Sequence, residues 1–520
     1  MILVVAKEGE LSVAQHLASA LRSAYESDVS VVASEFYDAI IRHPNLKSIN
    51  KIGIIDYFSF YGEVDSIARI TGTQDVIYSF REDELNRLEF FLKNHVHMEA
   101  FKTGRMEAPQ VVRADLVKYY SLLFDFYCSV IEKLSPHIVF DPYPNTVSRF
   151  VFQLACERYQ IKYLTMFHSR YDDYLVISES VDEPGVKLRS KYEKDKTAPI
   201  LARAKKIVID FRKKTEVLSN DELNFQKKYA RYGLVDVLKV TLSSVKWIIH
   251  NKTIVNRQSW FKNVDGAGFK QLMIGSSLRA AFLSVMIASR VLLRSTFNIK
   301  KAKTVKGPFF YWPLSYCNEG ESIFTKGGFF DTSYLEMIRY SLSLSDMIVI
   351  KDHRAMLGER SRCDIKFIKS IKEFLFVSPL DEKYADPIQL LRNSKGVITV
   401  NGTSGLEALL LGRPALILGK PIYWQFISGV QSNIYSDIHR FFKYPEEYIC
   451  SIEKTSEYVG AIIDQDIYCP SYASFLKMSL HHPSDEELMV CTAVATYIVN
   501  NYLNKGKAPT CKLAARSAFS

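Results

Sequence analysis

The chain has 520 residues, which at roughly 100–200 residues per domain corresponds to two to four domains. Hydrophobic residues make up 48%, aromatic residues 13% and charged residues 24%, so the composition excludes a mostly disordered chain. The formal net charge of +10 is unevenly distributed, because residues 201–310 contain 22 Lys and Arg against 6 Asp and Glu. This basic segment predicts contact with a polyanion, either an anionic membrane surface or a nucleic acid; a solvated lysine-rich helix face is the alternative.

The cysteines and the apolar stretches indicate the cellular compartment. None of the eight cysteines has a CxxC or zinc-finger spacing, which favours reduced thiols in a cytosolic protein. Residues 1–8 lack the basic start of a signal peptide, and the apolar stretch 273–293 carries Arg279 and Arg290, which argues against a transmembrane helix. We therefore expect a cytoplasmic protein that lies on a membrane surface.

The first part of the chain has the pattern of a parallel α/β domain. Short β-branched runs predict strands at 2–6, 29–33, 51–55, 137–140 and 162–167. Between them, apolar residues at helical spacing predict a helix after residue 10, mostly helical structure over 83–134, and a helix over 147–159. We assign residues 1–181 to an amino-terminal Rossmann-like domain.

The middle and the end of the chain are predicted to be helical. Residues 182–306 form a basic helical segment with expected helices at 198–214, 235–250 and 269–295. The residues 247–249 and the stretch 269–293 are apolar enough to lie at a bilayer surface, although such apolar stripes more often reflect core packing. Residues 476–520 are expected to form a carboxyl-terminal helix and a loose tail.

Strands and helices alternate regularly over residues 307–475. Strands are predicted at 308–314, 347–351, 374–377, 396–400 and 415–418, and helices at 331–344, 387–393 and 404–411. Such alternation is typical of a doubly wound sheet, so this segment is predicted to be a second Rossmann-like domain. The expected fold class is α/β, with two Rossmann-like domains facing a cleft and a basic helical insertion.

The most informative motif lies at residues 397–414. A buried strand leads into a loop of small and hydroxyl residues, and a helix starts at once near Thr403 and Ser404. Free backbone N–H groups, two hydroxyls and the glycines at 402 and 405 suit a phosphate, and Glu407 in the first turn suits ribose hydroxyls. The alternative interpretation is an ordinary Ser404 N-cap with a dipole-favoured Glu407.

Two further clusters follow predicted strand ends, where open α/β sheets bind ligands. The first supplies positive charge at a strand end through Lys351, His353, Arg354 and Arg360, unless it is simply an exposed polar turn. The second contains Glu319 and Glu321, either of which could act as a base or be a solvated loop acid.

In their order and spacing, five segments resemble the bacterial capsule and surface-polysaccharide biosynthesis proteins, which are glycosyltransferases of the two-Rossmann GT-B type. The segments are Pro313-Leu314-Ser315-Tyr316-Cys317-Asn318-Glu319, Gly327-Gly328-Phe329-Phe330-Asp331, Lys351-Asp352-His353-Arg354 with Gly358 and Arg360, 399–409, and 412–423. In the first domain, 137–145 and 161–169 with Arg170 are similar to other segments of the family. Ser315, Cys317 and Arg354 replace the family's His, Gln and Pro. If the family's His or Gln carries out the proton transfer, its replacement here would alter the acceptor chemistry or abolish activity.

The resemblance implies transfer of a sugar from a nucleotide-sugar donor to a surface glycan, either capsule or O-antigen, linked to a lipid at the cytoplasmic face of the membrane. Lys351, Arg354, Arg360, Thr403, Ser404, Gly405 and Glu407 would bind the donor. His353 would stabilise the donor phosphate and Glu319 would accept the acceptor proton, with Asp331 and then Glu8 as replacement bases. We expect no cofactor, no metal and no nucleic acid. A nucleotide-sugar 2-epimerase and a non-catalytic glycan-assembly protein are the alternatives.

Overall fold

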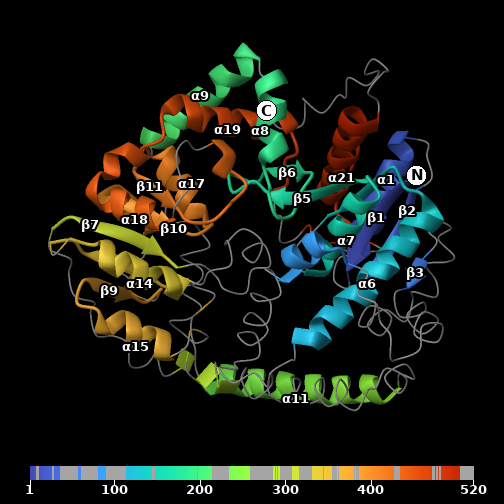
Figure 1. The fold of residues 1–520 in the computed structure, drawn as a ribbon, viewed down its shortest axis with the longest axis horizontal. Helices are drawn as coiled ribbons and strands as arrows, with labels where there is room; N and C mark the ends of the chain where they lie inside the picture. Colours follow the sequence, from blue (N-terminus) through green and yellow to red (C-terminus); the bar gives the residue numbers. More distant parts are fainter. Residues whose placement is uncertain are drawn as a thin grey trace.

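The computed structural model describes about three fifths of the chain, in segments spread from residue 1 to residue 503. These are residues 1–7, 11–25, 29–35, 57–59, 80–89, 113–142, 147–195, 197–213, 234–257, 285–286, 288–289, 291–292, 307–314, 331–343, 345–353, 356, 360, 362–379, 381, 386–426, 434–470, 475, 478 and 482–503. Figure 1 shows that they form two lobes, each built on its own sheet.

The first lobe contains a six-stranded sheet of order β3-β2-β1-β4-β5-β6. Five strands run parallel and the last is antiparallel to its neighbour: β1 (Ile2–Lys7), β2 (Val29–Glu35), β3 (Tyr57–Ser59), β4 (Ile138–Asp141), β5 (Lys162–His168) and β6 (Leu175–Ser178). The strand order reverses between β1 and β4, which makes that edge the switch point of a doubly wound sheet.

Helices cover both faces of this sheet. Successive side chains of a strand point to opposite sides, so each strand contributes to both buried faces. Leu3 and Val5 of β1 pack with α6 (Arg113–Leu134) and α7 (Val147–Arg158). Ile2 and Val4 face the other way, toward α1 (Leu11–Tyr25) and α21 (Asp485–Ile498). The uninterrupted apolar run of β1 follows from this double burial.

The second lobe contains a fully parallel five-stranded sheet of order β11-β10-β7-β8-β9. Its strands are β7 (Phe309–Pro313), β8 (Ile348–Lys351), β9 (Phe374–Val377), β10 (Ser394–Thr399) and β11 (Ala415–Ile417). One face packs against α14 (Asp331–Ser341), α15 (Arg362–Ser370) and α18 (Ile434–Lys443), and the other against α16 (Pro387–Asn393), α17 (Thr403–Leu410) and α19 (Ile452–Gln465). The fold class of two Rossmann-like domains is therefore confirmed.

The second lobe includes helices that lie before the domain boundary predicted from the sequence. α8 (Val186–Asp195) and α9 (Ala198–Lys213) pack against α19 in the core of the second lobe, although they lie in the segment expected to be a separate basic unit. The contact is close, because a Cβ at Gly460 of α19 would lie 2.5 Å from the Tyr192 hydroxyl. Lysines and arginines dominate the sequence of α8 and α9, but the few apolar residues of the two helices determine their packing against α19.

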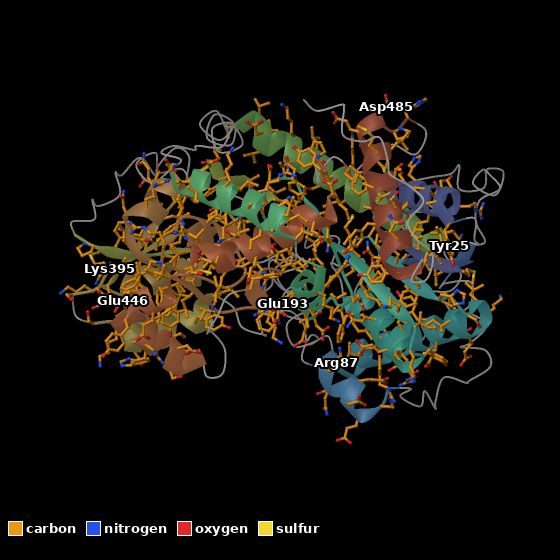
Figure 2. The ribbon with its side chains drawn as sticks, turned by 90° about the horizontal axis from the view of Figure 1, so that it is seen from above. Tyr25, Arg87, Glu193, Lys395, Glu446 and Asp485 are labelled. Carbon is orange, nitrogen blue, oxygen red and sulfur yellow. The ribbon has the colours of Figure 1, made fainter. Side chains whose placement is uncertain are left out.

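The carboxyl-terminal helix returns to the first lobe. α21 packs against α1, and Ile467 and Cys469 already belong to the first lobe's core. Figure 2, viewed from above, shows Asp485 at the same end of the molecule as Tyr25, whereas Lys395 and Glu446 mark the opposite end. The first lobe is thus completed by residues from both ends of the described chain.

Several element boundaries differ from those expected. The third strand of the first sheet lies at β3, and the predicted strand at 51–55 lies outside the described residues. α11 extends over Leu234–Arg257, longer than predicted, and only six positions of the expected helix 269–295 are described, all helical. β6 was not predicted, and the tail 504–520 lies outside the described residues. Cys128, Cys156, Cys450, Cys469 and Cys491 are buried free thiols.

Candidate functional site

The candidate site lies at the carboxyl edge of the second sheet. Because the strands are parallel, the ends of β7, β8 and β10 meet at this edge, and the strand order reverses between β7 and β10. Pro313 of β7 pairs with Lys351 of β8, and the Leu314 N–H donates to the Lys351 carbonyl at 2.9 Å. Lys351 is buried, so its charge is presented at this edge rather than in open solvent.

The amino terminus of α17 follows β10 directly. Its N-cap is Gly402, in extended conformation and without a side chain, so Thr403 and Ser404 are the first two helical residues. Within the described part of the chain, no hydrogen bond is found for either hydroxyl, and both residues are half-buried. The alternative interpretation of Ser404 as the N-cap is therefore wrong. Glu407 begins the second turn of the helix, not the first as expected.

Tyr423 and Gly405 hold this helix against the sheet. The Tyr423 hydroxyl donates to the Gly402 carbonyl at 2.7 Å, and the Gly402 N–H donates to Thr399 Oγ1 at 3.0 Å. A Cβ at Gly405 would lie 2.7 Å from Thr399 Cγ2 and 2.8 Å from Ile417 Cδ1, and closer still to the Tyr423 hydroxyl. Gly405 is buried and its N–H donates to Gly402, so close helix packing accounts for this glycine.

Glu407 and Lys351 form the charged part of the site. Burial raises the pKa of Glu407 to about 7, and the positive charge of Lys351 opposes that shift. Lys351 ends β8 and Glu407 lies on α17, so the fold brings together two residues that are 56 positions apart. A carboxyl group with this pKa exists in both protonation states near neutral pH and is able to donate or accept a hydrogen bond.

The loop after β8 is fixed by a buried ion pair. Arg360 Nε lies 2.6 Å from Asp352 Oδ1, and both side chains are 2% exposed. The same carboxylate oxygen accepts from the His353 N–H at 2.9 Å, so the pair also orients the half-buried His353. Met356, in the same loop, is fully buried and belongs to the core cluster of the first lobe. This loop therefore connects the candidate site to the other lobe.

Arg170 reaches the site from the first lobe. It follows β5 with a φ of 66°, a left-handed conformation that is uncommon for a residue other than glycine. Its position is fixed on both sides: the preceding Ser169 carbonyl accepts from the Tyr458 hydroxyl of α19, and the Arg170 N–H donates to His168 Nδ1 at 3.1 Å. Burial raises the pKa of Tyr423 and the charge of Arg170 opposes this, so the Arg170 charge lies near the side chain that holds Gly402.

Sequence reasoning left Arg170 and Tyr423 outside the set of site residues, although both occur in the segments that carry the family resemblance. Of the expected residues, the structure brings together Lys351, His353, Thr403, Ser404 and Glu407 at one sheet edge. Arg360 is engaged with Asp352, which offsets its charge. Glu319, Arg354 and Glu8 lie outside the described residues, and Asp331 is the first residue of α14. Among the described residues, no three His, Cys, Asp or Glu side chains are arranged to hold a metal.

Comparison with known proteins points to one family. Residues 343–440 match the family model described as capsule polysaccharide biosynthesis protein, which confirms the resemblance over this segment. The matched segment contains β8, β10 and α17, and so most of the candidate site. No curated protein matches the chain.

Solved structures with some likeness include two classes of enzyme. Thermosulfurimonas dismutans KpsC, a beta Kdo 2,7 transferase, is 11% identical with a TM-score of 0.29, over 65% of this chain and 80% of that one. A putative UDP-N-acetylglucosamine 2-epimerase from Listeria monocytogenes is 11% identical with a TM-score of 0.23, over 88% and 90% of the two chains. The UDP-GlcNAc 2-epimerase of Methanocaldococcus jannaschii, in complex with UDP-GlcNAc and UDP, is 10% identical with a TM-score of 0.26, over 89% and 99%.

Proposed function

We propose that this chain, whose residues 343–440 match the capsule polysaccharide biosynthesis family, is a glycosyltransferase of the GT-B type. It transfers a sugar from a nucleotide-sugar donor to a surface glycan, capsule or O-antigen, that is linked to a lipid at the cytoplasmic face of the inner membrane. The observation that carries the proposal is the meeting of the α17 amino terminus with Lys351 and Glu407 at one sheet edge.

The donor phosphates would lie against the amino terminus of α17. The first N–H groups of a helix and its dipole favour an anion, and the hydroxyls of Thr403 and Ser404, at the start of α17, would donate to phosphate oxygens. Lys351 adds a buried positive charge, which strengthens such hydrogen bonds. Glu407 would accept from ribose hydroxyls, and those donors would favour its ionised form.

In the transfer step, the acceptor hydroxyl loses its proton to a base and its oxygen forms a bond to the anomeric carbon of the donor sugar. The bond between that carbon and the phosphate oxygen breaks, and its electron pair leaves with the nucleotide. We assign Glu319 as the base, with Asp331 and then Glu8 as replacements. His353, Arg354 and Arg170 would stabilise the negative charge of the departing nucleotide, so the reaction we propose uses neither a metal nor a cofactor.

A thermal-shift panel of nucleotides and nucleotide sugars tests the donor site. At about 100 times its Kd, the correct donor stabilises the protein by roughly 2.7 kcal/mol, which is readily measured. The Thr403→Ala/Ser404→Ala variant, whose two half-exposed residues lie outside the core, should keep its unliganded melting temperature and lose most of the shift. If no nucleotide stabilises the wild-type protein, the proposal is wrong.

A further inference from the structure

α11 exposes a broad apolar face. The exposed fractions are 72% for Leu234, 62% for Val235, 61% for Leu238, 65% for Leu242 and 47% for Val245. Figure 1 shows α11 along the bottom of the view, apart from both sheets. A contiguous apolar patch of this kind on a soluble protein marks a binding surface rather than ordinary solvent exposure.

This apolar face is not the side by which α11 contacts the rest of the protein. At 3.6 residues per turn, the five exposed apolar residues fall within an arc of about 100°. The opposite side of the helix carries the less exposed positions: buried Ser244 and half-buried Val237, Val240 and Thr241. The helix therefore has an inner side and a separate outer apolar side, and the outer side needs another partner.

The charges on α11 identify the chemistry of that partner. Lys239 and Lys246 are exposed and follow the apolar arc along one edge, within about 40° of it. Asp236 is the one acidic residue of the helix, and it projects away from the arc. Residues 201–310 as a whole contain 22 Lys and Arg against 6 Asp and Glu. Apolar side chains bordered by lysines fit a lipid surface with negatively charged headgroups.

We propose that α11 lies in the plane of a membrane that contains anionic lipids, with its apolar face among the acyl chains and its lysines among the headgroups. Among the described residues, no helix is long and apolar enough to cross a bilayer. A helix lying flat needs only one apolar side, and its lysines extend their charged ends to the headgroups. The inference goes beyond the proposed function, since it holds for any chemistry at the candidate site.

Vesicle flotation of the full chain tests this inference. Vesicles of phosphatidylcholine with phosphatidylglycerol should bind the wild-type protein, and vesicles of phosphatidylcholine alone should bind it weakly. Leu238→Gln/Leu242→Gln should lower the partition coefficient at least about tenfold, because two partly buried leucines return to water. Lys239→Gln/Lys246→Gln should lower it by about fivefold per lysine at low salt and have little effect at high salt.

The matched control is Leu488→Gln/Met489→Gln on α21, where the exposed fractions are 39% and 49%. Glutamine and leucine have similar helix propensities, so both pairs should leave the circular dichroism unchanged. Equal flotation of the Leu238/Leu242 variant and the control would overturn the inference, as would equal binding to neutral vesicles. Light scattering without vesicles tests the alternative occupant. If the wild-type protein is a dimer and the leucine substitutions dissociate it, the apolar face of α11 binds a second copy of the chain and the inference is wrong. Because no donor is present, failure here is independent of failure of the proposed function.

Discussion

Replacing Gly405 with alanine tests the packing of α17, because the structure determines whether this substitution stabilises or destabilises the protein. In an open helix position, replacing glycine with alanine stabilises a protein by about 0.5–1 kcal/mol. At Gly405 a Cβ would lie 2.7 Å from Thr399 Cγ2 and 2.8 Å from Ile417 Cδ1, and closer still to the Tyr423 hydroxyl. These neighbours belong to two strands and a buried tyrosine, so none of them can move away freely. Gly405→Ala should therefore destabilise the second lobe by about 1–3 kcal/mol.

The consequence should extend to the ligand site. If the new methyl group displaces Tyr423, its hydroxyl no longer holds the Gly402 carbonyl, and the amino terminus of α17 shifts. Tyr423→Phe removes the nearest of the three clashing atoms, so the double variant should lose less stability than the two single variants added together.

Thermal melting with and without nucleotide is the assay, and about 2–4 °C corresponds to each kcal/mol for a lobe of this size. Ser404→Ala on the same helix, where the side chain is half exposed, is the control and should change stability by no more than about 0.5 kcal/mol. A melting temperature of Gly405→Ala equal to or above that of the wild type would show that the packing argument is wrong.

Three further changes address the chemistry of the site. Removing the hydroxyls of Thr403 and Ser404 should weaken nucleotide binding, measured by calorimetry, about tenfold to a hundredfold. Unchanged affinity would show that these hydroxyls do not bind the nucleotide. Arg360→Met should destabilise the protein by about 3–5 kcal/mol in chemical denaturation, since it leaves Asp352 buried without its ion-pair partner; a loss below about 1 kcal/mol would contradict the burial of the pair. The pKa of Glu407 is raised from 4.5 to about 7 in the folded state, so the unfolded chain loses this proton at lower pH than the folded protein does. The folded state is therefore destabilised as the pH rises from about 4.5 to about 7. Glu407→Gln should lack this loss of stability, so its melting temperature should rise relative to that of the wild type between pH 4.5 and 7. Melting temperatures that change with pH in the same way in both proteins would refute the raised pKa of Glu407.

The sequence was sufficient to predict the layers of the fold and one edge of the site. Alternating strand and helix patterns over residues 307–475 imply parallel strands, and parallel strands bring the ends of β8 and β10 to the same edge. That is why Lys351, His353 and the start of α17 could be placed together from their positions alone. The family match over residues 343–440 falls on the same stretch.

Long-range packing could not be predicted in the same way. The return of α21 to α1 and the docking of α8 on α19 depend on a few apolar residues that resemble any amphipathic helix. The pairing of Arg360 with Asp352 depends on how the loop after β8 folds, so a residue expected to contact the donor instead fixes that loop. Arg170 comes near Tyr423 only because the two lobes meet there, and no local pattern encodes that meeting.

The most direct test of the central claim is sugar transfer itself. Purified protein is given a labelled nucleotide sugar and membrane-extracted glycan, and the label in glycan and the released nucleotide are both measured. We expect one released nucleotide per sugar transferred, a loss of about 10²–10⁴-fold in turnover with unchanged donor binding for Glu319→Gln, and losses in both for His353→Ala. Conversion of the donor without any glycan would identify a 2-epimerase instead, and donor binding with no turnover on any acceptor would identify a non-catalytic assembly protein; either result would contradict the account.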